Sequence, residues 1–595
     1  MASEHQLGAT FTVQNSSGDT VLTGQVGDSV GGWSRRYPYV YPLDFNAVTT
    51  PGSYTIHVNG SAPATSPTFR IDAAPALYAQ ALANSLSFYQ VQRDGPDFIA
   101  GPLRTAPGHL NDAHAITYNT PHVNGDGVFS GDLSALHTTR NASGGWWDAG
   151  DYLKFVQTTS FTVDLLMLGI RDFPAQMGPE SPSSDFSAEA KFGARWLLRM
   201  WDDRSRTLYY QVGIGSGNNH IAGDHDIWRL PQRDDTYGRG DPTYLYIRHR
   251  PVFRAGAPGS PISPNLAGRD AAALAEAYQV FKTSDPKFAA QCLRAAEHIF
   301  DLADTSPKGH LLTVIPFDFY PESEWRDDLE LGATELAVAL SGGEFPTVPH
   351  ASSRFYLRKA AHWAKAYITG PNDAADTLNL YDVSGLAHFE LYRALSDAGN
   401  PSGLEVTKAQ LLADLHKQLE QAIKQGTKDP FGFGFPWGTY DTTAHGAGLS
   451  VMASEYDQLS GTQDFADQSQ EWLANILGAN AWGSSFIVGD GTTFPDCLQH
   501  QVANRVGSLD GSGPVLAGAA VEGPNSAPAR GRLPGMKRCP INSRDSFARF
   551  NGHGAQWKDN VESYSNTEPA VDLTAASPLA FAYQMSDPRK DQAGV

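Results

Sequence analysis

Residues 144–155 read Gly144-Gly-Trp-Trp-Asp148-Ala-Gly-Asp151-Tyr-Leu-Lys-Phe, which places two carboxylates three residues apart beside paired indoles and flexible glycines. Aromatic faces can stack on sugar rings, glycine lets the backbone approach a ligand, and an ionised carboxylate can activate a water molecule. The structural alternative is a turn whose Asp side chains cap a helix beginning near Tyr152. The rest of the sequence decides between a sugar-cleaving site and a simple turn.

The composition is that of a large, acidic, globular protein. The 595 residues are 41% hydrophobic and 11% aromatic, enough for a large core with rings left over for a ligand groove. A formal net charge of −20 disfavours nucleic acid or an anionic membrane surface as a partner, because phosphate binding needs clustered Lys and Arg. We therefore expect a neutral substrate and no nucleic-acid or membrane partner. Separately, we expect a monomer.

The first 73 residues predict a small domain of their own. Short β-branched and aromatic runs, separated by Ser-Gly-Asp, Pro-Gly-Ser and Asn-Gly-Ser turns, are typical of an immunoglobulin-like β-sandwich. The predicted strands are residues 10–13, 20–23, 39–45, 54–58 and 68–72. Five strands are fewer than the seven or so of a complete sandwich, so the domain could lack a strand or two at its N-terminus.

From residue 76 the apolar residues recur at helical spacing. Helices are predicted for residues 76–93, 161–171, 186–201, 269–281, 287–302, 329–340, 353–367, 380–395, 404–424, 445–459, 465–477 and 576–585. A dozen helices without intervening strands favour concentric rings of inner and outer helices. A solenoid would give a similar pattern, but no fixed repeat stands out. We assign residues 76–590 to this second, all-α domain.

The chain resembles glycoside hydrolase family nine, in the form that carries an N-terminal immunoglobulin-like module. The resemblance rests on residues 39–45, 144–155 and 241–253, and on residues 557–575, which include Glu568. It implies an (α/α)6 barrel with an open cleft, in which β-1,4-linked glucans are hydrolysed with inversion. It also implies that the module supports the barrel, that no cofactor is needed for the chemistry, that a structural Ca²⁺ could be present, and that the protein is secreted.

The family motif implies a catalytic role for three carboxylates. Asp151 resembles the base, Asp148 would hold or orient the attacking water, and Glu568 resembles the general acid. Inversion needs the acid and the base on opposite faces of the sugar, roughly 6.5–9.5 Å apart. The alternative for Glu568, shared with Glu562, is a solvated position before the last helix. Thr574 stands where the family usually has Asn, which affects the positioning of the acid.

Binding roles rest on weaker patterns. Trp146 and Trp147 are predicted as a wall or sugar platform. Gln499-His500-Gln501 replaces the family's His-His-Arg, so only His500 is carried over as a donor to sugar hydroxyls, with Arg505 a candidate for the missing guanidinium. A lone loop His is more often structural. Three aromatic residues are further candidates for lining sugar subsites: Tyr564, Trp437 and Trp228.

The sequence contains candidate calcium ligands and three cysteines. The oxygen-rich loop at residues 215–228 contains Asp224 and Asp226, which are candidates for calcium, although a solvated loop explains them equally well. Cys497 and Cys539 lie in Gly/Pro-rich sequence and could pair. Cys292, inside a helical pattern, is predicted as a buried thiol.

Three functions remain open. The first is an inverting endo-β-1,4-glucanase of the cellulase type. The second is an exo-acting β-glucosidase or glucosaminidase on short oligosaccharides, with the cleft blocked by the long segment 215–266 or by the altered His500 region; such an enzyme could work in the cytoplasm. The third, a non-catalytic glycan-binding protein, is disfavoured because Asp148, Asp151 and Glu568 are all retained. The N-terminal residues show no basic and apolar leader pattern, and no run of 18 apolar residues occurs.

Overall fold

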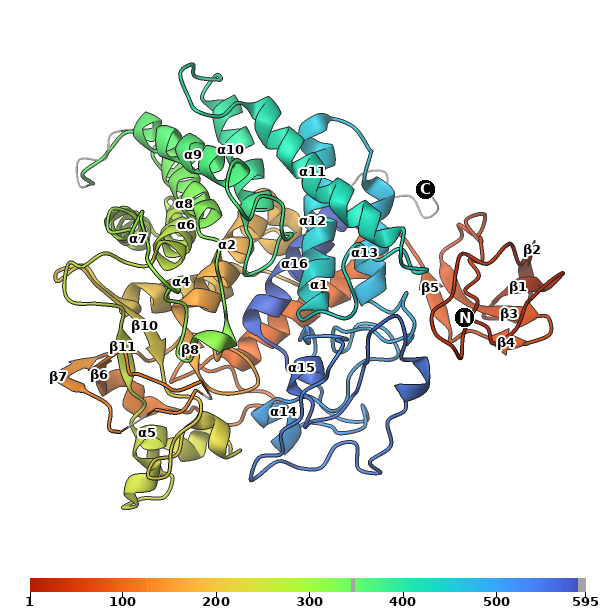
Figure 1. Ribbon diagram of the computed structural model, residues 1–595, viewed down its shortest axis with the longest axis horizontal. Coiled ribbons are helices and arrows are strands. Elements are labelled where there is room, and N and C mark those ends of the chain that lie inside the picture. The colour runs from red at the N-terminus through yellow and green to blue at the C-terminus, as the bar shows by residue number, and fades with distance from the viewer. Residues whose placement is uncertain (126, 130, 344–347, 587–595) are drawn as a thin grey trace.

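In the computed structural model, which describes residues 1–125, 127–129, 131–343 and 348–586, a small sheet domain lies beside a large helical domain (Figure 1). The strands of the small domain end at Ile71, and the first helix, α1, begins at Ala74. The predicted division of the chain after residue 73 falls in this junction and remains a prediction. The predicted end of the second domain, at residue 590, lies outside the described residues.

The small domain is built on one antiparallel sheet with the order β2-β1-β3-β4, in which β5 also pairs with β3. Its strands are β1 (Thr10–Asn15), β2 (Thr20–Gln25), β3 (Gly52–Asn59), β4 (Ala64–Thr65) and β5 (Phe69–Ile71). The predicted strand at residues 39–45 is wrong, because only isolated bridges form at Tyr39 and Val40. Leu43 and Phe45 instead pack onto a small core around Phe11, Val13 and Tyr54.

The helical domain contains two concentric rings, and each of its twelve main helices overlaps one predicted from the sequence. The inner helices contact one another in a closed circle; they are α2 (Val156–Asp172), α6 (Pro264–Phe281), α8 (Arg326–Ala339), α10 (Ser384–Asp397), α12 (Thr442–Ser460) and α16 (Val571–Ser586). Each packs mainly against one outer helix; these are α1 (Ala74–Gln92), α4 (Ser187–Met200), α7 (Pro286–Phe300), α9 (Ser353–Ile368), α11 (Lys408–Gly426) and α13 (Ala466–Ile476). The (α/α)6 barrel prediction is confirmed.

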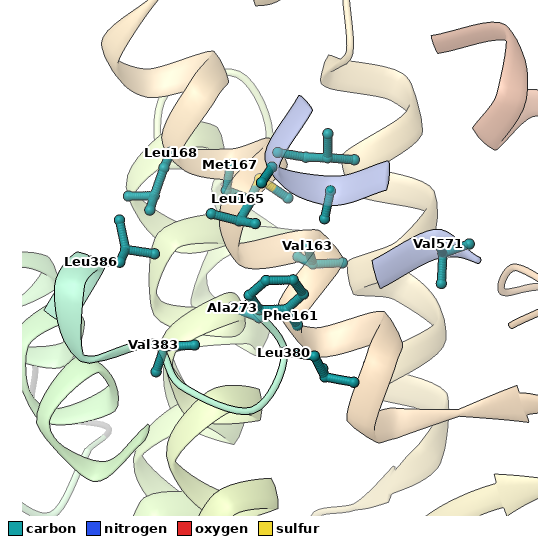
Figure 2. Packing of buried hydrophobic residues seen from close by; sticks show 14 of the residues in the cluster. Phe161, Val163, Leu165, Met167, Leu168, Ala273, Leu380, Val383, Leu386 and Val571 are labelled. Carbon is teal, nitrogen blue, oxygen red and sulfur yellow. The ribbon is translucent and has the colours of Figure 1, made fainter. Parts of the chain in front are cut away.

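Burial explains which helices form which ring. The inner helices are buried on nearly every side, so apolar and small residues occur all around them, whereas the outer helices keep one polar face toward solvent. Figure 2 shows Phe161 and Val163 of α2, Ala273 of α6, Leu386 of α10 and Val571 of α16 in this packed interior. The core therefore lies inside the ring and between the two rings.

A second sheet was not predicted, and the expectation of helices without intervening strands is wrong. Its strands are short and far apart in the chain; they are β6 (Ala115–Asn119), β7 (Ala135–Arg140), β8 (Lys154–Phe155), β9 (Trp201–Asp202), β10 (Thr207–Val212) and β11 (Val252–Arg254). β8 directly follows the Asp148–Asp151 segment and pairs with β10. This sheet therefore fixes the chain just before α2. Among the described residues, four short α-helices lie outside the two rings: α3 (Pro174–Met177), α5 (Leu245–Arg248), α14 (Gln501–Val506) and α15 (Tyr564–Thr567).

The small domain docks on the barrel through an aromatic anchor. Trp33 is 2% exposed, and its indole Nε1 donates to the Phe550 carbonyl oxygen at 2.6 Å. Its ring meets Trp482 and Phe431 edge-on, each at 5.4 Å between centroids. The burial of Trp33 supports the expectation that the module braces the barrel. No helix in the described part of the chain combines the length and apolar character needed to cross a bilayer.

Candidate active site

A cavity of about 840 Å³ opens at the end of the barrel where inner helices begin. Its wall includes residues just before or at the start of α2, α8, α10, α12 and α16. Helix N-termini carry partial positive charge, which favours carboxylates at this end of the barrel. The cavity brings together all three predicted catalytic carboxylates, Asp148, Asp151 and Glu568, although the last is about four hundred residues from the others in sequence.

Asp148 lines the cavity but is only 3% exposed, and hydroxyl groups hold both of its oxygens. The Thr158 hydroxyl, in the first turn of α2, donates to Oδ1, and the Tyr320 hydroxyl donates to Oδ2 at 2.7 Å. Burial, and then the charges of Asp572 and Asp151, raise the pKa of Asp148 well above its usual range. A protonated carboxyl in this position can orient a water molecule but is a poor base.

Asp151 is the more accessible of the two aspartates, and an imidazole holds it in place. Its Oδ1 accepts from the Leu153 backbone N–H at 2.9 Å, and its Oδ2 lies 2.6 Å from His225 Nε2. Burial alone would lower the pKa of His225, but the hydrogen bond to Asp151 and its charge outweigh that effect and raise the pKa to about 9. At neutral pH Asp151 therefore faces an imidazolium.

Glu568 ends the short helix α15 and precedes α16. Its Oε1 accepts from the Gly150 backbone N–H at 3.2 Å, so this carboxyl is tied directly to the segment that carries the two aspartates. Burial, and then the charge of Asp151, raise the pKa of Glu568 to about 8, against the opposing effects of His225 and the Gly150 N–H. Glu568 is thus protonated at neutral pH, as a general acid must be.

The fold and this geometry agree with the comparisons. The family model described as glycosyl hydrolase family 9 matches residues 78–581, and the model described as the cellulase N-terminal ig-like domain matches residues 2–62. The chain belongs to glycosyl hydrolase family 9. It is therefore a glycoside hydrolase, and the predicted resemblance is confirmed for both parts of the chain.

Relatives of this family 9 chain are distant but extend over most of its length. Endoglucanase 19 of Oryza sativa subsp. japonica is 26% identical over 566 residues, which cover 85% of this chain and 88% of that protein. Endoglucanase D of Acetivibrio thermocellus is 22% identical over 96% of this chain and 79% of its own length. The crystal structure of the family 9 endoglucanase J30 matches with a TM-score of 0.71 at 20% identity, covering 100% of this chain and 98% of that one.

Trp146 and Trp147 do not form a sugar platform in this family 9 structure, so that prediction is corrected. Both indoles are fully buried. Trp146 Nε1 donates to Glu189 at 2.7 Å, and Trp147 packs against Tyr152 and the Arg104 guanidinium. These rings are core residues packed beside the Asp148–Asp151 segment, and neither reaches the cavity.

His500, Arg505 and Trp437 are also placed away from the cavity, which corrects their predicted binding roles. His500 is fully buried; its Nε2 pairs with Gln92, and its Nδ1 caps α14 by accepting from Ala503 N–H. Arg505 donates to the Gly535 carbonyl oxygen. Trp437 is 2% exposed and stacks on Phe433. All three stabilise the surrounding loops.

Two of the predicted aromatic residues do line the cavity. Tyr564 is 43% exposed, and Trp228 contributes part of its otherwise buried ring. Trp228 packs in a cluster with Met536, Val561 and the Cys497–Cys539 disulfide, which the sequence left open. Cys292 is a free, buried thiol, as predicted.

The calcium prediction for Asp224 and Asp226 is not supported, because protein donors already hold both carboxylates. Asp224 pairs with Arg229 and accepts from the Tyr152 N–H, while Asp226 accepts from the Gly217 and Gly223 N–H groups. Within the described ranges, one group of three side chains brings its ligand atoms close enough for a metal ion, and it lies at the end of α7 and before α9: Glu297, Asp301 and His350.

Several cavity residues were missed by the sequence reasoning. His225 lies in the loop that was predicted to bind calcium. Tyr320 and Tyr381 lie in loops that contain no recognisable motif. The only local signal was the imidazole between two aspartates in Asp224-His225-Asp226. Its contact with Asp151, 74 positions away, depends on the fold.

Proposed function

We propose that this family 9 enzyme cleaves β-1,4-glucosidic bonds within glucan chains, with inversion at the anomeric carbon. One observation carries the proposal: a protonated carboxyl, Glu568, and a carboxylate paired with an imidazolium, Asp151, face the same cavity. These are the two protonation states that an inverting hydrolase needs. The distant relatives named endoglucanases support action within the chain rather than at its end.

Each of these residues has its own role in the proposed reaction. Asp151 takes a proton from a water molecule, whose oxygen bonds to the anomeric carbon while the bond to the leaving oxygen breaks. Glu568 gives its proton to that leaving oxygen. Asp148, held by Thr158 and Tyr320, would orient the water, and Tyr564 offers a ring face to a sugar unit.

The test uses neutral substrates, because the cavity wall is acidic and carboxymethyl cellulose is anionic. The wild-type enzyme should lower the viscosity of hydroxyethyl cellulose early in the reaction, and the first product of cello-oligosaccharide cleavage should be the α-anomer by NMR. Asp151→Asn and Glu568→Gln should each lose on the order of 10²–10⁴-fold in kcat. Glu568→Gln should recover rate on a substrate with an activated aryl leaving group, which needs less protonation.

Glu562→Gln is the matched control. Glu562 is six residues away on the same segment and pairs with the exposed Arg532, so this change should leave kcat within twofold. Near-wild-type rates for Asp151→Asn, or release of glucose alone from chain ends, would contradict the proposal.

We also propose that the enzyme works outside the cell. The Cys497–Cys539 disulfide joins two segments of the cavity-bearing loop region, and such bonds persist in oxidising compartments.

A further inference from the structure

Three side chains outside the cavity are arranged like the ligands of a metal ion: Glu297, Asp301 and His350. Their ligand atoms all lie within 4.8 Å of one another. Glu297 is in the last turn of the outer helix α7, Asp301 caps the C-terminus of that helix, and His350 shortly precedes the outer helix α9. None of the three lines the catalytic cavity, so this group is separate from the substrate site.

Glu297 is the member that points most directly to a ligand. It is fully buried, and its Oε1 accepts from the His350 backbone N–H at 2.6 Å. Burial raises the pKa of Glu297, against the hydrogen bond from His350 and the nearby Tyr356 hydroxyl. Neither Glu297 Oε2 nor that hydroxyl has a hydrogen-bond partner among the described residues. Burying a carboxylate oxygen without a partner costs free energy, and a bound cation removes that cost.

The spacing of Asp301 and His350 is that of two ligands of one metal ion. His350 Nε2 lies 3.5 Å from Asp301 Oδ2, and in the described part of the chain Asp301 has no closer ionic partner. That separation is long for a hydrogen bond, but it is close to the roughly 3.4 Å between two ligands that each lie about 2.0–2.1 Å from a tetrahedral metal ion. The imidazole is held by stacking on Phe355, with 4.3 Å between ring centroids.

The types of ligand favour zinc. Zn²⁺ binds imidazole nitrogen together with carboxylate oxygen, whereas Ca²⁺ and Mg²⁺ prefer oxygen ligands throughout. The C-terminus of α7 carries partial negative charge, which adds to the two carboxylates in attracting a cation. The side chains of Asp301 and His350 are 33% and 39% exposed, so an ion can enter from solvent and a water molecule can complete the tetrahedron.

We propose that Glu297, Asp301 and His350 bind one Zn²⁺ ion, which fastens the end of α7 to the segment before α9. The ion neutralises the buried Glu297 carboxylate and cross-links two parts of the outer ring of helices. Its role is structural, and it takes no part in the hydrolysis assigned to Asp151 and Glu568. A metal ion that binds only the folded protein stabilises it, so zinc should raise the melting temperature.

The test is isothermal titration calorimetry of the full-length protein, without a histidine tag, treated with a chelator and then titrated with Zn²⁺. The wild type should bind one equivalent at micromolar concentrations, and its Tm should rise by about 2 °C at roughly a hundredfold excess of Zn²⁺ over Kd. Asp301→Asn and His350→Ala each remove one ligand and should weaken binding by at least about tenfold. Ca²⁺ should not compete for the site.

His362→Ala is the matched control, because this exposed imidazole on α9 pairs with one carboxylate, Glu405, and the described residues place no third ligand beside it. It should keep the zinc affinity of the wild type. Melting temperatures without zinc show whether each variant still folds. Zinc binding that neither Asp301→Asn nor His350→Ala weakens would show that the ion binds elsewhere, and a wild type that binds no zinc would equally overturn the inference. Hydrolysis by the zinc-free enzyme tests the proposed function separately.

Discussion

At the scale of single residues, Gly150 sets the distance between the two halves of the site. A Cβ at this position would lie 1.8 Å from the Gln499 carbonyl oxygen and 3.0 Å from the His500 Cα, and both are backbone atoms that cannot simply rotate away. We expect Gly150→Ala to push the aspartate segment away from Glu568, whose side chain accepts from the Gly150 N–H. A misplacement of about 1 Å can cost on the order of 10²-fold in rate, which kcat measurements would reveal.

Gly101→Ala is the control for this change, because a Cβ there would meet no atom within 4 Å. It should keep wild-type kcat and Tm. If Gly150→Ala also keeps full activity, the close contact with Gln499 does not constrain the site.

The pH dependence follows from the two raised pKa values. Glu568 must be protonated to act as an acid and has a pKa of about 8, so kcat/KM should fall as pH rises above 8. His225⁺ lowers the pKa of Glu568, so removing that charge in His225→Asn should move the alkaline limb to higher pH while reducing kcat. Full pH profiles of both proteins check the sign, and a limb that moves to lower pH would contradict the assignment of Glu568 as the acid.

The sequence predicted which carboxyl residues share the site better than it predicted the orientation and contacts of the side chains around them. The motifs predicted that Asp148, Asp151 and Glu568 share one site, and the structure brings all three to one cavity. Local sequence does not predict whether the indole of Trp146 or Trp437 is buried in the core or lines a cleft, because an indole fits both environments equally well. Contacts such as that between His225 and Asp151 join distant segments and leave no local pattern.

At the scale of helices and strands, hydrophobic periodicity predicted the long helices reliably, but it did not predict the short strands of the second sheet. The outer helices carry apolar residues along one face, and the inner helices carry apolar residues at helical spacing beside buried polar ones, so both kinds were recognised. The strands of the second sheet are two to six residues long, and β6 pairs with β11 more than a hundred residues later. Such pairing is decided by tertiary packing rather than by local propensity.

Helix α6 predicts a stability effect that depends on pH. Asp270 is fully buried, both of its oxygens lack hydrogen-bond partners among the described residues, and burial raises its pKa to about 7. The folded protein therefore holds this proton more tightly than the unfolded chain, and stability is lost as pH rises through 7. Asp270→Asn stays neutral, so its Tm should exceed that of the wild type by several degrees at pH 9 and match it near pH 4.

Asp397→Asn, at the exposed end of α10, removes the same charge without a burial effect. Its Tm should follow the wild type at every pH, apart from small shifts. An Asp270→Asn protein whose Tm falls with rising pH as steeply as that of the wild type would show that the pKa of this carboxyl is not raised in the folded protein.

At the scale of the whole molecule, the small domain and the barrel are joined by Trp33. The indole fills a pocket formed by Trp482, Phe431 and His553, and its N–H bonds to the barrel backbone at Phe550. Truncating a buried Trp costs about 3–5 kcal/mol, so Trp33→Ala should lower the Tm and expose the linker near residue 73 to proteases. Scanning calorimetry and limited proteolysis measure both effects.

Val30→Ala serves as the control, because Val30 lies in the same domain but is 54% exposed. It should melt like the wild type. Deletion of residues 1–72 should leave the Trp33 pocket open to solvent and promote aggregation, whereas a stable, active barrel without the module would show that the module is dispensable.

The Cys497–Cys539 bond has a practical consequence for recombinant production. Neither cysteine belongs to a barrel helix, but the loops around them supply Gln499, Glu522 and Leu533 to the cavity wall. Enzyme made in a reducing bacterial cytoplasm should therefore give the circular dichroism spectrum of an intact barrel together with a low specific activity. Mild oxidation after purification should restore that activity, so helical content alone is an unsafe measure of a good preparation.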